Sequence, residues 1–245
     1  MEKISKISYI IPVYNEEENL QPLLDDLTEV AEKVSIPFEI IFIDDASTDD
    51  SLKIIKSMET NFEHIKHISF LKNCGQSAAL HAGFLYSTGD VIITMDADLQ
   101  NDPDDIPGML EYYGEYDIVN GWRADRQDSL WKKIGSFIGN SVRNVLTNEN
   151  IQDTGCSLKV MRASLVSRLK MFRGLHRFLP TLLKLEGASV IEVKVNHRPR
   201  KHGQSKYSNM SRAFSGLYDL LAVRWMINRQ INIHVKESNI DNVKI

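Results

Sequence analysis

The chain has 245 residues, 42% hydrophobic and 25% charged, which suits one α/β domain with an appendage and excludes disordered, collagen-like and disulfide-stapled chains. Its net charge of −4 hides an asymmetry, because residues 1–122 hold 7 Lys and Arg against 24 Asp and Glu, whereas residues 123–245 hold 22 against 9. We therefore expect an acidic half that binds a cation and a basic half that meets phosphate or an anionic surface; two solvated faces of opposite sign are the alternative.

Apolar runs and helical patterns alternate through the first half of the chain. The apolar runs predict strands at residues 7–11, 38–43, 65–71, 91–95 and 116–120. Capping residues and helical spacing predict helices that begin at Asn15, Ser47 and Pro103, and a further helix over residues 77–87. The first helix should bury a stripe formed by Leu20, Leu23, Leu24, Leu27, Val30, Ala31 and Val34. The alternation predicts a mainly parallel sheet with helices on both faces.

The second half of the chain has weaker periodicity. It predicts a helix over residues 129–146, strands over 157–161 and 189–195, a basic loop over 198–207 and a long helix over 209–229. The long helix carries an apolar stripe, formed by Phe214, Leu217, Tyr218, Leu221 and Trp225. A stripe of this kind, with arginines beside it, packs on the catalytic domain, on a partner or in a membrane interface.

An acidic cluster follows the strand that ends at Met95. In an extended segment alternate residues point the same way, so Asp96, Asp98 and Gln100 present three oxygen-bearing side chains on one side. Oxygen ligands of this kind suit Mg²⁺ or Mn²⁺. The alternative is a loop whose aspartates only cap the helix after Pro103.

Polar residues also follow the first two strands. An aromatic ring beside a carboxylate, Tyr14 and Glu16, suits a nucleobase or ribose, and one of the adjacent carboxylates Asp44 and Asp45 could accept from a base or ribose. Helix capping is the alternative at both places. No glycine fingerprint follows the first strand, which makes a dinucleotide-binding dehydrogenase the weakest hypothesis.

Taken together, these motifs resemble family 2 glycosyltransferases of the GT-A fold, and in particular the dolichyl- and polyprenyl-phosphate sugar transferases. The resemblance rests on six matches in order along residues 4–230, namely residues 11–16, 44–49, 96–103, Arg123, the D-x-G-C element at 153–156 and the R-x-x-G-x-S-K-Y loop at 200–207. It implies an α/β, Rossmann-like sandwich with a mainly parallel central sheet and a C-terminal amphipathic helix.

The resemblance also implies a role for each matched position. The nucleotide sugar would be bound by Pro12, Tyr14, Glu16, Ile43, Asp45, Asp96, Ala97 and Arg123. The metal, Mg²⁺ or Mn²⁺, would be held by Asp96, Asp98 and Gln100, and the catalytic residues would be Asp98, Asp153, Arg200 and Lys206. The catalytic domain would span residues 1–207, with a nucleotide-sugar half at 1–122 and an acceptor half at 123–207, followed by a helical appendage at 208–245.

The implied reaction is the inverting transfer of a sugar, as by a hexosyltransferase, from a nucleoside-diphosphate sugar (UDP or GDP) to a polyprenyl phosphate in cell-envelope glycan synthesis. A hydroxyl acceptor would need a general base, which Asp153 could supply, whereas a phosphate acceptor is already an anion near pH 7, so that Asp153 could instead orient an Arg or Lys. Two alternatives stay open: the same class with a hydroxyl acceptor, and a nucleotide-sugar binding module without turnover. Cys156 fits a small buried residue better than a nucleophile.

The expected location is cytoplasmic and peripheral on the inner face of the membrane, against a membrane surface or a membrane-protein partner. The sequence has no run of about 18 apolar residues, its N-terminal segment does not resemble a secretory signal, and two cysteines suit a reducing compartment. Nucleic acid is not expected as a partner, because the basic residues are not interleaved with aromatics and the pI is ≈ 6.0.

Overall fold

A computed structural model describes residues 3–124, 141–147, 149–199 and 209–231, with the backbone alone at 209–215. Arg200, Lys206 and most of the helix predicted over residues 129–146 lie outside this part of the chain; residues 141–147 are helical.

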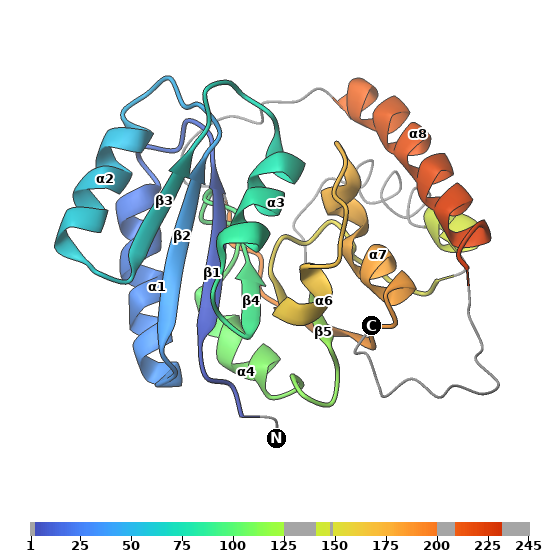
Figure 1. Cartoon of the computed structure of the whole chain (residues 1–245), viewed down its shortest axis with the longest axis horizontal. Helices are drawn as coiled ribbons and strands as arrows, with labels where there is room; N and C mark the ends of the chain where they lie inside the picture. The colour runs from blue at the N-terminus through green and yellow to red at the C-terminus, as the bar shows by residue number, and fades with distance from the viewer. Residues whose placement is uncertain (1–2, 125–140, 148, 200–208, 232–245) are drawn as a thin grey trace, which may run out of the picture.

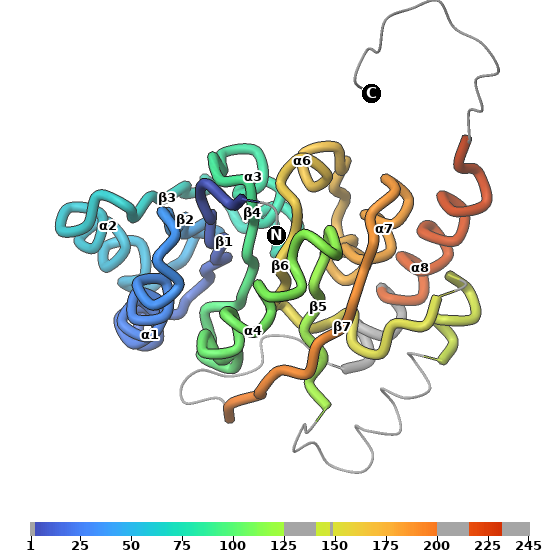
Figure 2. The backbone as a smooth tube through the Cα atoms, turned by 90° about the horizontal axis from the view of Figure 1, so that it is seen from below, coloured from blue at the N-terminus to red at the C-terminus, as the bar shows by residue number. Residues whose placement is uncertain are grey.

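The centre of the described fold is a seven-stranded sheet in the order β3-β2-β1-β4-β6-β5-β7. The strands are β1 (Ile7–Val13), β2 (Phe38–Asp44), β3 (Ile65–Ser69), β4 (Val91–Thr94), β5 (Ile118–Trp122), β6 (Lys159–Arg162) and β7 (Val190–Lys194). β6 runs antiparallel to both its neighbours, and every other pair is parallel. The predicted mainly parallel sheet is therefore confirmed (Figures 1 and 2).

Helices cover both faces of this sheet, as the alternating pattern predicted (Figure 1). They are α1 (Leu20–Val34), α2 (Ser51–Asn61), α3 (Gln76–Tyr86), α4 (Ile106–Leu110), α6 (Ala163–Val166), α7 (Leu179–Leu185) and α8 (Asn209–Asn228), with 3-10 turns η1 (Pro103–Asp105) and η2 (Leu175–Phe178). One core lies between the sheet and α1, α2 and α4, and a second between the sheet and α3, α7 and α8. α3 approaches β1 closely at Gly83, where an added Cβ would meet the Ile10 side chain at 2.3 Å.

Two predicted helix starts are wrong. α1 begins at Leu20 and α2 at Ser51. The Ser47 hydroxyl accepts from the backbone N–H of Asn15 at 3.0 Å, and the Asn15 side-chain oxygen accepts from the backbone N–H of Thr48 at 2.7 Å. Asn15 and Ser47 therefore join the loops after β1 and β2 instead of capping helices. The helix predicted from Pro103 begins as the short turn η1 before α4.

Glu39 on β2 is a buried carboxylate with a complete set of partners. It accepts from the Ser8 hydroxyl at 2.7 Å and the Thr88 N–H at 2.7 Å, and it pairs with the ammonium groups of Lys6 at 3.0 Å and Lys66 at 2.5 Å. Burial would raise its pKa, but the hydrogen bonds from Lys66, Ser8 and Thr88 outweigh this and lower it from 4.5 to about 2.

We expect Glu39→Gln to lower the free energy of unfolding at pH 7 by about 2 kcal/mol, because the amide leaves a buried ion pair broken. A depressed pKa contributes stability above the unfolded-state pKa and loses it as pH falls. The difference between wild type and variant should therefore shrink from pH 4.5 toward pH 2. Urea unfolding at several pH values measures it, and a constant difference would show that the charge of Glu39 does not stabilise the fold.

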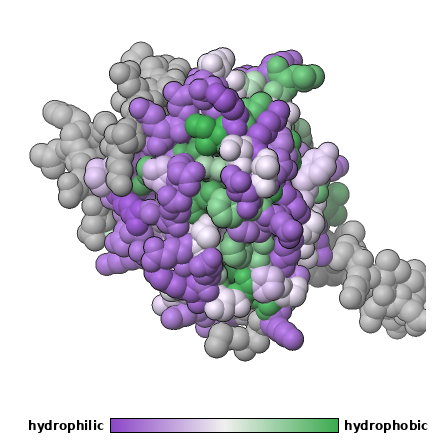
Figure 3. All heavy atoms as spheres, turned by 90° about the vertical axis from the view of Figure 1, so that its left-hand side faces the viewer, coloured by the Kyte–Doolittle hydropathy of each residue, from purple (hydrophilic) through white to green (hydrophobic). Residues whose placement is uncertain are grey.

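The face on the side of α2 and β3 is mostly hydrophilic, with a band of apolar residues along its middle (Figure 3). β3 is an edge strand of the sheet and carries Lys66 and His67. Charged side chains on an edge strand oppose pairing with a second sheet. The lysine on this edge strand is therefore of the residue type that opposes edge-to-edge aggregation in natural sheets.

α8 lies along the side of the fold near α7, at the opposite end from α2 (Figures 1 and 2). It packs through Leu220 and Val223, which are 5% and 0% exposed. Four residues of the predicted stripe instead face outward, at 49–77% exposure: Leu217, Tyr218, Leu221 and Trp225. For these four residues, packing on the catalytic domain, which was one of the predicted alternatives, is therefore wrong. The helix is apolar on two sides, and its predicted amphipathic character is not confirmed. Among the described residues no helix is long and apolar enough to cross a bilayer.

Candidate active site

The sheet brings several loops to one edge. β1, β2 and β4 are parallel, so their carboxyl ends coincide, with Val13 beside Asp44 and Ile10 beside Thr94. The antiparallel β6 starts at this same edge, where Lys159 lies beside Thr94. The ends of β5 and β7 lie there as well. Ligands of open α/β sheets bind beyond the carboxyl ends of the strands.

Each loop that follows β1, β2 and β4 contains a non-glycine residue with left-handed backbone. These residues are Asn15 (φ 53°), Ala46 (φ 59°) and Leu99 (φ 61°). This conformation is strained for Ala and Leu, and such strain persists only where surrounding contacts hold it, often at functional sites. The strain marks these loops as the candidate active site.

The acidic turn after β4 is held in place by neighbouring amides. Gln76 donates to the Asp96 carboxylate at 2.7 Å, and the side-chain oxygen of Asn101 accepts from the Asp96 N–H at 3.1 Å and from the Ser157 hydroxyl at 2.8 Å. Burial, and then the charge of Asp98, raises the pKa of Asp96 to about 6. Two carboxylates that repel each other at a sheet edge favour a bound cation.

The residues expected around the nucleoside are at this edge but differ in what they expose. Tyr14 and Glu16 are half-buried, whereas the side chains of Ile43 and Ala97 lie in the two cores, which leaves their backbone groups for a ligand. Pro12 pairs with Ile43 in the register of β1 and β2.

Asp45, also expected at the nucleoside, is 4% exposed. Its two carboxylate oxygens accept from the backbone N–H groups of Cys74 at 2.6 Å and Gly75 at 2.8 Å. Gly75 has φ 88°, which suits glycine, and is the N-cap residue directly before α3. Asp45 therefore fixes the loop before α3 at the site.

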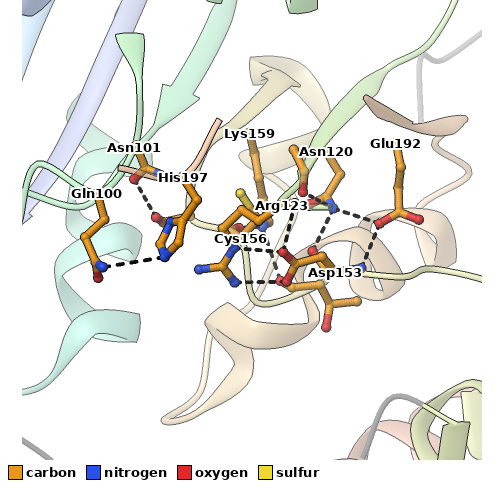
Figure 4. A network of polar contacts seen from close by, with 12 residues as sticks. Gln100, Asn101, Asn120, Arg123, Asp153, Cys156, Lys159, Glu192 and His197 are labelled. Carbon is orange, nitrogen blue, oxygen red and sulfur yellow. Dashed lines mark hydrogen bonds and ion pairs between the residues drawn. The ribbon is translucent and has the colours of Figure 1, made fainter. Parts of the chain in front are cut away.

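Arg123 and Asp153 form a two-pronged ion pair (Figure 4). Arg123 Nε lies 2.8 Å from Asp153 Oδ2, and Arg123 Nη2 lies 2.9 Å from Oδ1. Although burial opposes it, the bond from Arg123 lowers the pKa of Asp153. An ionised carboxylate with both oxygens on a guanidinium is a poor proton acceptor and a good orienter.

The loop that contains Asp153 is held by hydrogen bonds from several elements (Figure 4). Glu192 on β7 accepts from the backbone N–H groups of Gln152 at 2.7 Å and Asp153 at 2.9 Å. Asn120 on β5 donates to the Asp153 carbonyl at 2.9 Å, and buried Lys159 on β6 donates to the carbonyls of Thr154 and Cys156. These contacts fix the orientation of the Arg123–Asp153 pair.

Four residues that hold the site together were not predicted from the sequence: Asn101, Asn120, Lys159 and Glu192. A lysine inside the apolar strand predicted at 157–161 was the available signal for Lys159. Cys156 is 1% exposed and burial raises its pKa, as suits a packing residue. Among the described residues no three His, Cys, Asp or Glu side chains could hold a metal ion, so a cation at the acidic turn would also depend on Gln100 and on oxygens of the substrate.

Comparison with solved structures identifies the fold. Glucosyl-3-phosphoglycerate synthase from Mycobacterium tuberculosis, in complex with Mn²⁺ and uridine-diphosphate-glucose, superposes with a TM-score of 0.66 at 18% identity, covering 89% of this chain and 79% of that one. Its complex with Mn²⁺, UDP and phosphoglyceric acid gives 0.68 at 16% identity, covering 93% and 80%. The shared fold is the GT-A fold of glycosyltransferases.

The sequence comparisons narrow the class to a family. The undecaprenyl-phosphate 4-deoxy-4-formamido-L-arabinose transferase of Pectobacterium atrosepticum is 39% identical over 223 residues, and that of Photorhabdus laumondii is 39% identical over 222. Each alignment covers 90% of this chain and 68% of the relative. A family model for glycosyl transferase family 2 matches residues 8–170, and the chain belongs to this family. The resemblance inferred from the motifs is confirmed, and the protein is a glycosyltransferase.

Proposed function

We propose that this enzyme transfers a sugar, with inversion, from a nucleoside-diphosphate sugar to a polyprenyl phosphate. The relatives named as undecaprenyl-phosphate sugar transferases support the acceptor class. The nucleotide-sugar complexes of the structural neighbours support the donor class. UDP and GDP remain alternatives for the donor.

The Arg123–Asp153 ion pair is the observation that favours a phosphate acceptor over a hydroxyl acceptor. A hydroxyl acceptor must lose a proton as it attacks, and Asp153 was the residue predicted from the sequence as a possible general base. In the structure both of its oxygens face Arg123. A phosphate monoester has a second pKa of about 6 and is already an anion near pH 7, so it needs orientation by cations and no base.

The acidic turn fits a hard divalent cation. Its side chains offer carboxylate and amide oxygens, and the repulsion between Asp96 and Asp98 is relieved when a cation binds. We infer that Asp96, Asp98 and Gln100 would hold Mg²⁺ or Mn²⁺, and the Mn²⁺ in the neighbours' complexes supports this. When bound, the ion stabilises the negative charge that develops on the departing diphosphate.

In the proposed reaction a phosphate oxygen of the acceptor attacks the anomeric carbon, and the bond from that carbon to the donor diphosphate breaks. The nucleoside diphosphate leaves with the electron pair. Arg123, oriented by Asp153, holds its guanidinium at a fixed place at the site, and preorganised hydrogen-bond donors of this kind contribute strongly to catalysis. Arg200 and Lys206, outside the described residues, are proposed to position the acceptor phosphate.

A panel of UDP- and GDP-sugars tests this function, each with Mg²⁺ or Mn²⁺ and with either undecaprenyl phosphate or undecaprenol. Released nucleoside diphosphate and labelled lipid are measured together. We expect labelled lipid with the phosphate alone. Equal transfer to undecaprenol would move the acceptor to the hydroxyl class, and donor binding without product in any combination would favour a module without turnover.

We further propose that the outward stripe of α8 (Leu217, Tyr218, Leu221 and Trp225) contacts the membrane from its cytoplasmic face. A polyprenyl tail stays in the bilayer, so the enzyme must meet its acceptor there. The stripe has two leucines and two amphipathic aromatic rings at 49–77% exposure, with exposed Arg224 on the same helix and exposed Arg229 directly after it, which is the composition of an interfacial helix.

The double variant Leu221→Gln, Trp225→Gln should therefore bind phosphatidylglycerol-containing vesicles at least about tenfold more weakly, since two side chains no longer enter the interface. Because both side chains are exposed, the fold should be unaffected. Leu85→Gln, Tyr86→Gln is the matched control, with apolar side chains 62% and 68% exposed at the end of α3. Vesicle sedimentation measures the effect, and wild-type binding by the α8 variant would assign the stripe to a protein partner.

A further inference from the structure

The proposed metal turn contains a residue in a costly conformation. Leu99 lies between Asp98 and Gln100 with φ 61°, and its side chain is 3% exposed in the core. Left-handed backbone is unfavourable for residues other than Gly, Asn and Asp, because Cβ approaches the following carbonyl oxygen. The turn therefore keeps Asp98 and Gln100 in place only while neighbouring contacts compensate for the strain.

A segment distant in the sequence supplies such contacts. Asn196, His197 and Arg198, which we call the clasp, follow β7 and lie against residues 100–102. The Arg198 N–H donates to the Gln100 carbonyl at 2.9 Å, and His197 forms an antiparallel bridge with Asn101. The His197 ring lies 3.5 Å from the Gln100 side-chain amide (Figure 4). The clasp thus holds the backbone of a proposed metal ligand and lies beside its side chain.

Carboxylates near the acidic turn and on α1 hold the clasp in place. The Arg198 guanidinium lies 2.6 Å from Asp102 Oδ1 and 2.5 Å from Asp26 Oδ2 on α1. The Asn196 N–H donates to Asp105 at 2.7 Å. The side chains of Asp102 and Arg198 are 13% and 30% exposed, so the bond between them is partly shielded from water.

We propose that Arg198 is a positioning residue that maintains the metal-binding geometry of the Asp98–Gln100 turn by joining Asp102 to α1. This inference rests on the proposed metal site. Arg198 is already neutralised by two carboxylates, which separates its role from that proposed for Arg200. A solvated surface ion pair with no effect on the turn is the alternative, and most exposed pairs contribute little.

Mn²⁺ titration followed by electron paramagnetic resonance tests the proposal on the full chain without donor or acceptor. We expect Arg198→Met to bind Mn²⁺ about five- to tenfold more weakly than wild type, and Arg198→Lys to recover part of the loss. Asp102→Asn should weaken binding similarly, and the double variant Arg198→Met, Asp102→Asn no further, because each change by itself breaks the link from Asp102 through Arg198 to α1.

Arg162→Met is the matched control. Arg162 forms an ion pair of similar geometry with Asp117, 2.7 Å apart and about a quarter exposed, at the opposite end of β6. Its loss should leave Mn²⁺ affinity unchanged even if thermal stability falls. Mn²⁺ affinity within twofold of wild type in Arg198→Met would overturn the clasp while the metal site stands. A wild-type chain that binds no Mn²⁺ would overturn the metal site itself, and the clasp with it.

Discussion

Asp98→Ala should reduce sugar transfer by about a thousandfold or more and abolish Mn²⁺ binding, with the fold intact. The change removes a proposed metal ligand at the centre of the acidic turn. It also removes a repulsive charge beside Asp96, whose pKa that charge helps to raise. The variant should therefore unfold at the wild-type temperature or above it, which separates a loss of chemistry from a loss of structure.

Asp104→Ala is the matched control, because Asp104 belongs to the same acidic stretch but its side chain is exposed. Turnover is measured as released nucleoside diphosphate, with and without EDTA. The control should keep wild-type activity and lose it in EDTA. The metal assignment would be contradicted if the Asp98→Ala variant had normal turnover and EDTA did not reduce the turnover of the wild-type enzyme.

Arg123→Met should lower kcat/KM for transfer by about 100- to 1000-fold, because it removes a preorganised cation from the site. If Asp153 acts by holding Arg123, Asp153→Asn should cost about 10- to 100-fold, and the double variant should be no worse than Arg123→Met alone. Non-additivity of this kind identifies two residues that act as a unit.

The same variants decide whether Asp153 is a base. An orienting Asp153 leaves the shape of the pH–rate profile unchanged in Asp153→Asn. A base would leave the variant without the acidic limb of that profile, and the double variant would lose far more than Arg123→Met. Initial rates must extend down to about pH 3 to distinguish the two, because the lowered pKa of Asp153 places such a limb below the ordinary range of an aspartate. A lost acidic limb would restore the hydroxyl acceptor as the favoured hypothesis.

The sequence by itself determined the sheet class and indicated which strand ends carry the candidate site. Apolar runs of strand length alternate with helical stripes, and only a parallel sheet covered on both faces buries both patterns. The polar clusters that follow the strands come together at one place, because parallel strands bring their carboxyl ends to the same edge of the sheet. The motifs at residues 11–16, 44–49 and 96–103 were enough to indicate the family, because each is a short run of neighbouring residues that can be read without the tertiary structure.

Only the tertiary structure decided what Asn15, Ser47, Asp153 and the stripe of α8 contact. Asn15 and Ser47 have the residue types of helix caps, but their partners lie about 30 residues away in each other's loops. Asp153 suited a base or an orienter until β5, β6 and β7 placed its carboxylate against Arg123. A stripe on α8 has the same spacing whether it faces a core or solvent, because periodicity defines a face and packing against other elements decides where that face points.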